Sequence, residues 1–264
     1  SVTVIVDGQP PATFDDAPSG WSNAAVTVTF AASDALSGVG ETRYRVGGGE
    51  WTVGDSVYLE DEGVHLIEYY SVDRAGNAET VKTAEVRIDR TAPVVDASAA
   101  SVVYRTDPIA FNISITDGLS GAASATVSLD GSAVSLPLQI APYTLSIGNH
   151  VLEVSAADHA GNSDTKVYPF RVEMDLDHLD DAIQYGYDQG WITNGGVLNS
   201  LLTLTSKILQ HAGNPAHVLR GLNALDNKVQ AQSGSHIDEA FANQLRADIA
   251  YLRELYEDGA APPA

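Results

Sequence analysis

Two fifteen-residue stretches of this chain repeat one another and constrain its fold more than any other feature. GVHLIEYYSVDRAGN begins at Gly63 and GNHVLEVSAADHAGN begins at Gly148, so the shared residues are displaced by 85 positions. A catalytic site is needed once in a chain, whereas a structural unit is needed in every copy. The repetition therefore predicts tandem copies of one structural unit.

The repeated motif reads as the corner of a β-hairpin. An alternating strand ends at an aspartate, and a Gly-Asn pair follows three residues later. Aspartate side chains hydrogen-bond nearby backbone groups in turns, and glycine and asparagine tolerate the left-handed conformation. We expect each corner to be held by its own side-chain hydrogen bonds.

Short strands and turns fill the chain as far as Glu173. Segments such as AVTVTF and FNISIT alternate apolar and polar residues, which is the period of a half-buried strand. SDALSGVG (33–40) returns as TDGLSGAA (116–123), and VRIDRTAPVV (86–95) has the same pattern as VIVDGQPP (4–11). These repeats predict β-sandwiches over 9–93 and 94–173. We expect residues 1–8 to be the tail of a preceding unit or a linker.

Beyond Glu173 the apolar residues recur at intervals of three and four, which is the helical period. We expect a domain over 174–258, with helices at roughly 175–189, 195–212, 215–231 and 236–257. Ser235 to Asp238 resembles a capping box at the start of the last helix. Residues 259–264 are expected to form a disordered tail.

Two family resemblances follow from these motifs. Residues 9–93 resemble the bacterial Ig-like repeat family named after a leptospiral outer-membrane protein, through "SGV", "YRVGGGEW", "DRAGN" and "IDRTAP". Residues 94–173 are similar to a more divergent bacterial Ig-like domain. Residues 174–258 resemble the helical domain called FIMAH, through "GWI", "LNSLLTLTSKIL" and "VLRGLNALDNKV". The implied fold is multidomain, with two all-β Ig-like sandwiches in tandem followed by an all-α four-helix domain.

Composition and charge argue against several classes of function. The chain has no cysteine and no run of 18 apolar residues, which argues against thiolate chemistry and membrane insertion. Its net charge is −21, and Lys and Arg are not clustered, so nucleic acid is not an expected partner. Known nucleophile, zinc-protease and phosphate-loop motifs are missing from the sequence. We expect no enzymatic activity in these residues.

Hard oxygen donors recur with the repeat and leave calcium open as an alternative to simple corner hydrogen bonding. Calcium is the one cofactor the pattern suggests, and none is required. The candidate ligands are Asp34, Asp73, Asn77 and Asp89 in the first repeat, with Asp117, Asp158 and Asn162 in the second.

Aromatic residues of the first repeat give a second alternative. Exposed tryptophan and tyrosine rings can stack on the apolar face of a pyranose, so Trp51 with Tyr44, Tyr69 and Tyr70 is a candidate carbohydrate-binding platform. Packing of these rings in the core is the competing interpretation. Because side chains alternate along a strand, Tyr69 and Tyr70 must face opposite sides of the sheet.

The sequence thus favours a non-catalytic accessory region, a spacer and adhesion or substrate-proximity module. The family resemblances imply a secreted or cell-surface bacterial protein, extracellular or attached to the cell wall. They also imply an upstream domain of the same protein that degrades polysaccharide. A polysaccharide or cell-wall glycan is the expected external partner.

Overall fold

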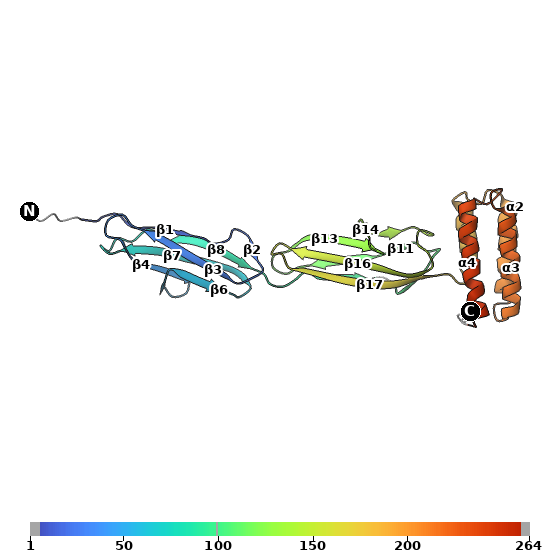
Figure 1. Cartoon of the computed structure of the whole chain (residues 1–264), viewed down its shortest axis with the longest axis horizontal. Helices are drawn as coiled ribbons and strands as arrows, with labels where there is room; N and C mark the ends of the chain where they lie inside the picture. The colour runs from blue at the N-terminus through green and yellow to red at the C-terminus, as the bar shows by residue number, and fades with distance from the viewer. Residues whose placement is uncertain (1–5, 99, 260–264) are drawn as a thin grey trace, which may run out of the picture. The chain divides into compact units, whose positions relative to one another are not determined.

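The computed structural model describes residues 6–98 and 100–259. Parts of the expected terminal segments 1–8 and 259–264 therefore lie outside the described residues. Strands occupy the described chain as far as Glu173, and four helices follow (Figure 1). The last strand ends at Glu173 and the first helix begins at Leu179.

The first repeat forms two sheets that share one core. Its strands are β1 (Ala12–Asp15), β2 (Trp21–Ser22), β3 (Val26–Ser33), β4 (Val39–Val46), β5 (Thr52–Val53), β6 (Ser56–Leu59), β7 (Gly63–Asp73) and β8 (Lys82–Ile88). One sheet has the order β1-β3-β6 and the other β2-β8-β7-β4-β5, with β2 parallel to β8. Buried residues of both sheets, including Phe30, Leu59, Ile67 and Val86, form one cluster, which makes this region a β-sandwich.

The second repeat has the same order in its larger sheet. Its strands are β9 (Val94–Ser98), β10 (Val102–Tyr104), β11 (Ile109–Ala110), β12 (Asn112–Thr116), β13 (Ala122–Leu129), β14 (Ser132–Val134), β15 (Gln139–Ile140), β16 (Gly148–Asp158) and β17 (Ser163–Glu173). The large sheet runs β10-β17-β16-β13-β14, again with a parallel edge pair, β10 and β17. β9 pairs with β12 and β11 with β15. The sequence repeat is therefore also a repeat of topology.

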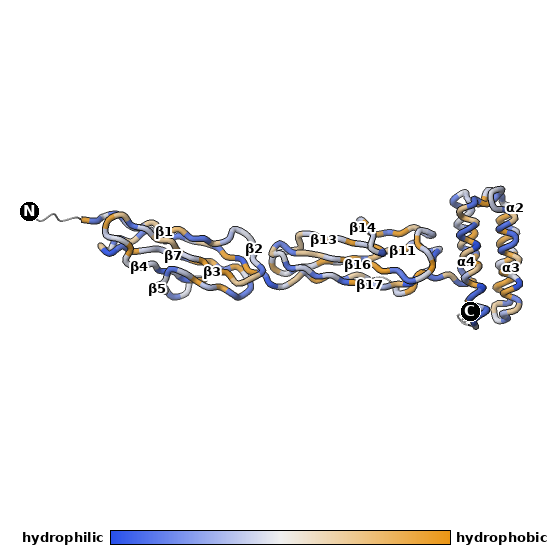
Figure 2. Tube along the Cα trace, in the orientation of Figure 1, coloured by the Kyte–Doolittle hydropathy of each residue, from blue (hydrophilic) through white to orange (hydrophobic). Residues whose placement is uncertain are grey.

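Burial follows the sequence alternation. Along β7, buried side chains occupy every second position from Ile67 to Asp73. Figure 2 shows apolar and polar residues alternating along the strands and forming stripes along the helices. The hydrophobic pattern thus determines which face of each element is buried.

The helices are α1 (Leu179–Asp188), α2 (Gly195–Leu209), α3 (Pro215–Gln232) and α4 (Glu239–Glu257). α1 begins at Leu179, whereas the sequence predicts a start near residue 175. The intervening residues form a turn, in which the Asp175 carboxylate accepts hydrogen bonds from the backbone N–H and the ring of His178. The expected capping box at Ser235 is wrong. Asp238 is itself the N-cap of α4 and accepts from the N–H of Phe241 at 3.0 Å.

The chain divides into two compact units that cut across the second repeat. The first unit contains the residues up to Asp96 together with Ser114–Thr126 and Val154–Lys166. The second contains Ala97–Ile113, Val127–Glu153 and the residues from Val167 on. None of the helices in the described part of the chain is long and apolar enough to span a bilayer.

Candidate functional site

The repeated motif forms a hairpin corner with its own hydrogen bonds, as the sequence predicts. At the end of β7, Asp73 accepts from the backbone N–H of Asn77 at 2.8 Å and from its side-chain amide at 2.7 Å. The N–H of Asp73 donates back to the Asn77 carbonyl at 3.0 Å. Gly76 has φ +92°, a left-handed conformation that suits glycine. The Asp-x-x-Gly-Asn spacing is thus explained by one closed turn.

Two further carboxylates lie beside this turn. Asp34 accepts from the N–H groups of Leu36 at 3.2 Å and Gly38 at 2.6 Å, which closes the loop before β4. Asp7 accepts from the N–H of Ser37 at 2.8 Å, and its own carbonyl accepts from the Asn77 side-chain amide at 3.2 Å. We call Asp7, Asp34, Asp73 and Asn77 the first corner cluster.

The second copy reproduces this arrangement bond by bond. Asp158 accepts from the N–H of Asn162 at 2.8 Å and from its amide at 2.7 Å. Asp117 accepts from Leu119 at 3.2 Å and Gly121 at 2.5 Å. Asp89 accepts from Ser120 at 2.8 Å, and its carbonyl accepts from the Asn162 amide at 2.8 Å. We call Asp89, Asp117, Asp158 and Asn162 the second corner cluster, and both clusters lie within the first unit.

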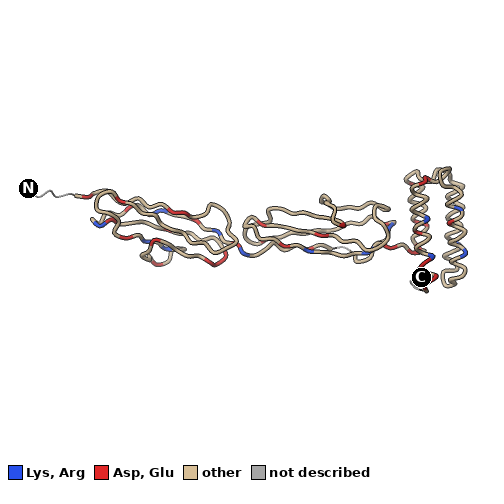
Figure 3. Tube along the Cα trace, viewed as in Figure 1, with Lys and Arg blue, Asp and Glu red and all other residues tan. Residues whose placement is uncertain are grey.

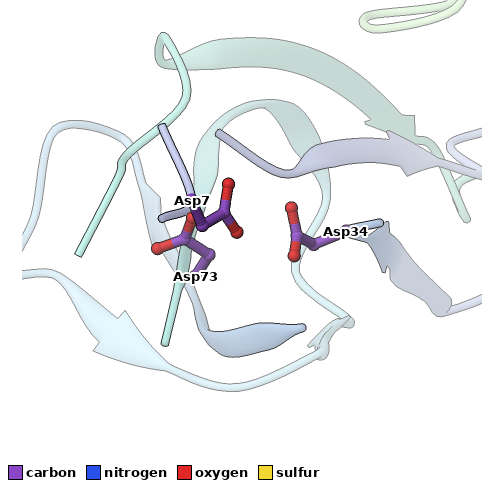
Figure 4. A group of neighbouring side chains, drawn as sticks. All are labelled: Asp7, Asp34 and Asp73. Carbon is purple, nitrogen blue, oxygen red and sulfur yellow. The ribbon is translucent and has the colours of Figure 1, made fainter. Parts of the chain in front are cut away.

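Each corner cluster gathers three carboxylates. One oxygen from each aspartate lies within 4.8 Å of the others, in both clusters. Figure 4 shows the side chains of Asp7, Asp34 and Asp73 gathered at one place from separate segments of the chain. Asp73, Asp89 and Asp158 are buried, and the other aspartates are half-buried. This is a set of hard oxygen donors of the type that calcium prefers.

Hydrogen bonds lower the pKa of three of these aspartates, Asp7, Asp73 and Asp89. Burial raises the pKa of Asp73, but the bonds from Asn77 outweigh it, and the net pKa lies below its ordinary value. Burial likewise raises the pKa of Asp89, and hydrogen bonding by Ser120 and Thr91 brings it below its ordinary value. The pKa of Asp7 is lowered by hydrogen bonding to Ser37 and Gln9. Asp7, Asp73 and Asp89 therefore carry negative charge near neutral pH.

One residue of the expected ligand set belongs to the other repeat. The sequence grouped Asp89 with Asp34 and Asp73, but its carboxylate lies with Asp117 and Asp158. The corresponding place in the first corner cluster is taken by Asp7, which the ligand set omitted. Asp89 directly follows β8, the last strand of the first repeat, and so reaches the loops of the next repeat.

The aromatic platform is smaller than expected. Trp51 and Tyr70 are half-buried and meet edge to face, with ring centroids 4.8 Å apart. The Arg45 guanidinium lies 4.6 Å from the Trp51 ring centre and makes two 2.8 Å bonds to Glu68. These bonds hold the pKa of Glu68 below its usual range.

Tyr69 and Tyr44 do not belong to this platform. Tyr69 is only 3% exposed, stacks on Phe30 and donates its hydroxyl to Asp15 at 2.6 Å. Tyr44 is paired with Tyr69 across β4 and β7, so it turns to the same face and packs on the same core. Their inclusion as sugar-stacking residues was wrong, whereas the opposite orientation of Tyr69 and Tyr70 is confirmed.

The second unit contains a buried ion pair that sequence reasoning missed. Arg105 of the second repeat pairs with Asp248 on α4, and these side chains are 9% and 0% exposed. The Arg105 guanidinium also lies 4.8 Å from the ring centre of Tyr143. Burial raises the pKa of Asp248 to about 6, against the opposing effect of Arg105. A separation of 143 residues gives no local signal for such a pair.

Comparisons with known proteins give partial matches to solved structures, at low sequence identity and low TM-score. No family model matches the chain, and no curated protein matches it. The fibronectin(III)-like modules of CbhA from Clostridium thermocellum are 15% identical, cover 61% of this chain and 94% of theirs, and give a TM-score of 0.34. The D00-D0 domain of intimin is 9% identical, covers 61% and 98%, and scores 0.32. A 1.5-MDa bacterial ice-binding adhesin is 15% identical, covers 58% and 59%, and scores 0.31. The leptospiral-type and FIMAH resemblances stay predictions.

Proposed function

We propose that this chain is a non-catalytic spacer with an adhesion or substrate-proximity role in a secreted or cell-surface bacterial protein. The observation that supports this proposal is the corner cluster, repeated with the same hydrogen bonds in two successive repeats. On this proposal the chain holds an upstream domain, a polysaccharide-degrading one by the family resemblance, near an extracellular or cell-wall surface.

The second corner cluster explains how such a spacer resists bending. Asn162 of the second repeat donates its amide to the carbonyls of Asp89 and Thr91, at 2.8 and 3.3 Å. Asp89 in turn accepts from the buried N–H of Ser120. The connection after β8 is thus hydrogen-bonded on both sides to loops of the next repeat. Hinge motion there would break several of these bonds together.

A distance measurement within the first unit tests this role. The chain has no cysteine, so cysteines introduced at the exposed positions Thr27 and Ser124 are the sole sites for spin labels. We expect a narrow distance distribution by double electron–electron resonance, and a broader one when Asn162→Ala removes the amide donors. Asn149→Ala, an exposed asparagine outside the cluster, is the matched control. A broad distribution in the unmodified pair, or no change in Asn162→Ala, would contradict the spacer mechanism.

A second candidate function is calcium-dependent stiffening of the same corners. Beyond the three carboxylates, Ser120 is 9% exposed and its hydroxyl has no hydrogen-bond partner among the described residues, while its N–H bonds to Asp89. A cation would neutralise the three carboxylates and offer this hydroxyl a partner. The hydrogen bonds already present are the competing explanation for the cluster.

Thermal unfolding in calcium and in chelator separates these two explanations. Calcium at 100 times its Kd would add about 2.7 kcal/mol, a rise in Tm of roughly 5–10 °C. Asp117→Asn keeps the oxygen that closes the loop and removes the negative charge, so it should reduce the rise in Tm that calcium causes. Asp164→Asn, at a surface pair with Lys166, is the control. Identical melting of the unmodified chain in calcium and chelator would leave the aspartates as corner hydrogen-bond acceptors.

The third candidate function is glycan binding at the Trp51 and Tyr70 face. The half-exposed rings beside the Arg45–Glu68 pair favour it, because they combine a stacking surface with groups that hydrogen-bond hydroxyls. On this candidate, Trp51→Ala should weaken retention on an insoluble polysaccharide while leaving the fold intact. Retention that is unchanged in this variant would exclude the face.

A further inference from the structure

The second unit contains a cavity that none of the preceding functions uses. It has a volume of about 440 Å³ and lies between the loop Ala141–Thr144, which joins β15 to β16, and the helical region. Tyr185 on α1, Trp191 after α1 and the first turns of α4 complete its lining. The volume is within the range of small-ligand sites, about 300–1,000 Å³.

Four aromatic rings build its walls and floor. Tyr185 and Trp191 are half-buried and nearly perpendicular, with centroids 5.6 Å apart at 77°. Tyr143 lies nearly parallel to Tyr185 at 5.8 Å and 14°. Phe241 is buried 5.5 Å from Tyr143 and 5.2 Å from Trp191. The two buried rings hold the two partly exposed rings in place, so the accessible ring surface is rigid.

The loop beneath the cavity is held in an unusual conformation. Tyr143 has φ +63°, which is rare for a residue with a side chain. Its N–H donates to the Arg105 carbonyl at 3.0 Å, and the Arg105 guanidinium lies over its ring. Arg105 is itself paired with Asp248 on α4. The cavity is therefore formed in advance by contacts that do not depend on a ligand.

The rim carries polar groups that are free for a ligand. Within the described residues, the Gln244 amide and the Thr144 hydroxyl make no hydrogen bond, although both residues line the cavity. Asp238 accepts the N–H of Phe241 with one carboxylate oxygen, and its other oxygen makes no hydrogen bond to any residue that the structure describes. The lining contains no Lys, Arg or His, so it lacks the groups that bind phosphate or sulfate.

We propose that this cavity binds one hexopyranose residue of a neutral polysaccharide. The apolar face of the sugar would stack on Trp191 or Tyr185, and its hydroxyls would bond to Gln244, Asp238 and Thr144. The Gln244 amide can donate and accept hydrogen bonds and the Asp238 carboxylate can accept them, so together they suit neighbouring sugar hydroxyls. A purely apolar ligand would leave both groups without partners. The site is separate from the Trp51 face and does not depend on the spacer proposal.

Calorimetric titration of the full chain with cellohexaose, laminarihexaose and chitohexaose tests the proposal. We expect at least one hexasaccharide to bind. Gln244→Ala should weaken that binding roughly 10-fold, as expected for the loss of one hydrogen bond. Gln230→Ala, on the exposed surface of α3, is the matched control and should bind as the unmodified chain does.

Two further variants locate the site. Trp191→Phe shortens the stacking surface but keeps a ring in the core, and Ala240→Phe adds bulk at an exposed position of the lining. Each variant should bind the hexasaccharide at least ~5-fold more weakly. The helical circular dichroism of both variants should be unchanged. Trp51→Ala should have no effect on this binding. The proposal is overturned if no hexasaccharide binds, if binding survives Gln244→Ala and Ala240→Phe at full strength, or if Trp51→Ala alone removes it.

Discussion

Asp248 makes the stability of the helical region depend on pH in an unusual direction. Its carboxylate is fully buried against Arg105, and one of its oxygens has no hydrogen-bond partner within the described residues. Burial raises the pKa from its ordinary value of 3.8 to about 6. At about 1.4 kcal/mol per pKa unit, this shift corresponds to about 3 kcal/mol.

The sign of the effect follows from which state holds the proton. Between about pH 4 and 6 the unfolded chain has released the Asp248 proton and the folded chain still binds it, so stability falls as the pH rises. The fall in stability continues as the pH rises through 6, and by about pH 7 the Asp248 carboxylate is largely ionised in both states. Asn at this position cannot titrate. The stability of the original chain relative to Asp248→Asn should therefore fall by about 2–3 kcal/mol from pH 4 to pH 7.

Urea denaturation followed by circular dichroism at 222 nm measures this difference, because the described helices all lie in the second unit. Asp226→Asn is the control, since Asp226 pairs with Arg246 at 2.7 Å at the partly exposed surface. Parallel pH profiles of the original chain and Asp248→Asn would refute the argument, because they would show that Asp248 is ionised in the folded state throughout this range.

Two matched pairs of substitutions test packing and the repeat. Gly186→Ala would place a Cβ 2.2 Å from Phe241, so we expect a loss of about 1–3 kcal/mol in calorimetry, whereas Gly195→Ala meets no atom closer than 4.0 Å and should be neutral. His150→Ala should cost about 2 kcal/mol in urea denaturation, because its buried ring bonds to two acceptors. His65→Ala should cost much less, since the His65 side chain is only half-buried and its ring bonds to one acceptor. Equal losses within either pair would contradict the contact geometry.

The strand and corner pattern could be predicted from the sequence because its causes are local. Asp73 and Asn77 are four residues apart, and their bonds close within the motif itself. Asp89 could be assigned to the second corner cluster only by recognising that a residue at the end of a strand reaches the loops of the next repeat. A signal for Asp7 was present, since VIVDGQPP and VRIDRTAPVV share the strand–Asp–proline order. Aligning these two segments would have put Asp7 and Asp89 in equivalent positions.

The orientation of the aromatic residues and the cavity of the second unit could not be predicted from sequence patterns. Strand alternation places Tyr69 and Tyr70 on opposite faces but does not say which face is inward. That choice depends on β3, whose Phe30 stacks on Tyr69. The cavity beside Trp191 brings together a loop of the second repeat and two helices, so no window of sequence contains it. Its prediction required the tertiary packing itself.

The position of Asp89 leads to a last prediction about the two corner clusters. Its carboxylate accepts from Ser120 and Thr91, and its own N–H donates to the Ser22 carbonyl on β2 at 2.9 Å. Asp89 thus connects the first repeat to the loops of the second. Asp89→Ala would leave the buried N–H of Ser120 without an acceptor, at a cost of about 1–3 kcal/mol.

Asp7→Ala is the matched comparison, because Asp7 accepts the equivalent bonds from Ser37 and Gln9, which are half-buried and exposed. Water can replace its carboxylate there, so the loss should be smaller. Urea denaturation followed by Trp21 and Trp51 fluorescence, in a Trp191→Phe background, measures both variants in the first unit. Equal losses in the two variants would show that burial does not distinguish the clusters, and that Asp89 contributes to its turn no more than Asp7 does.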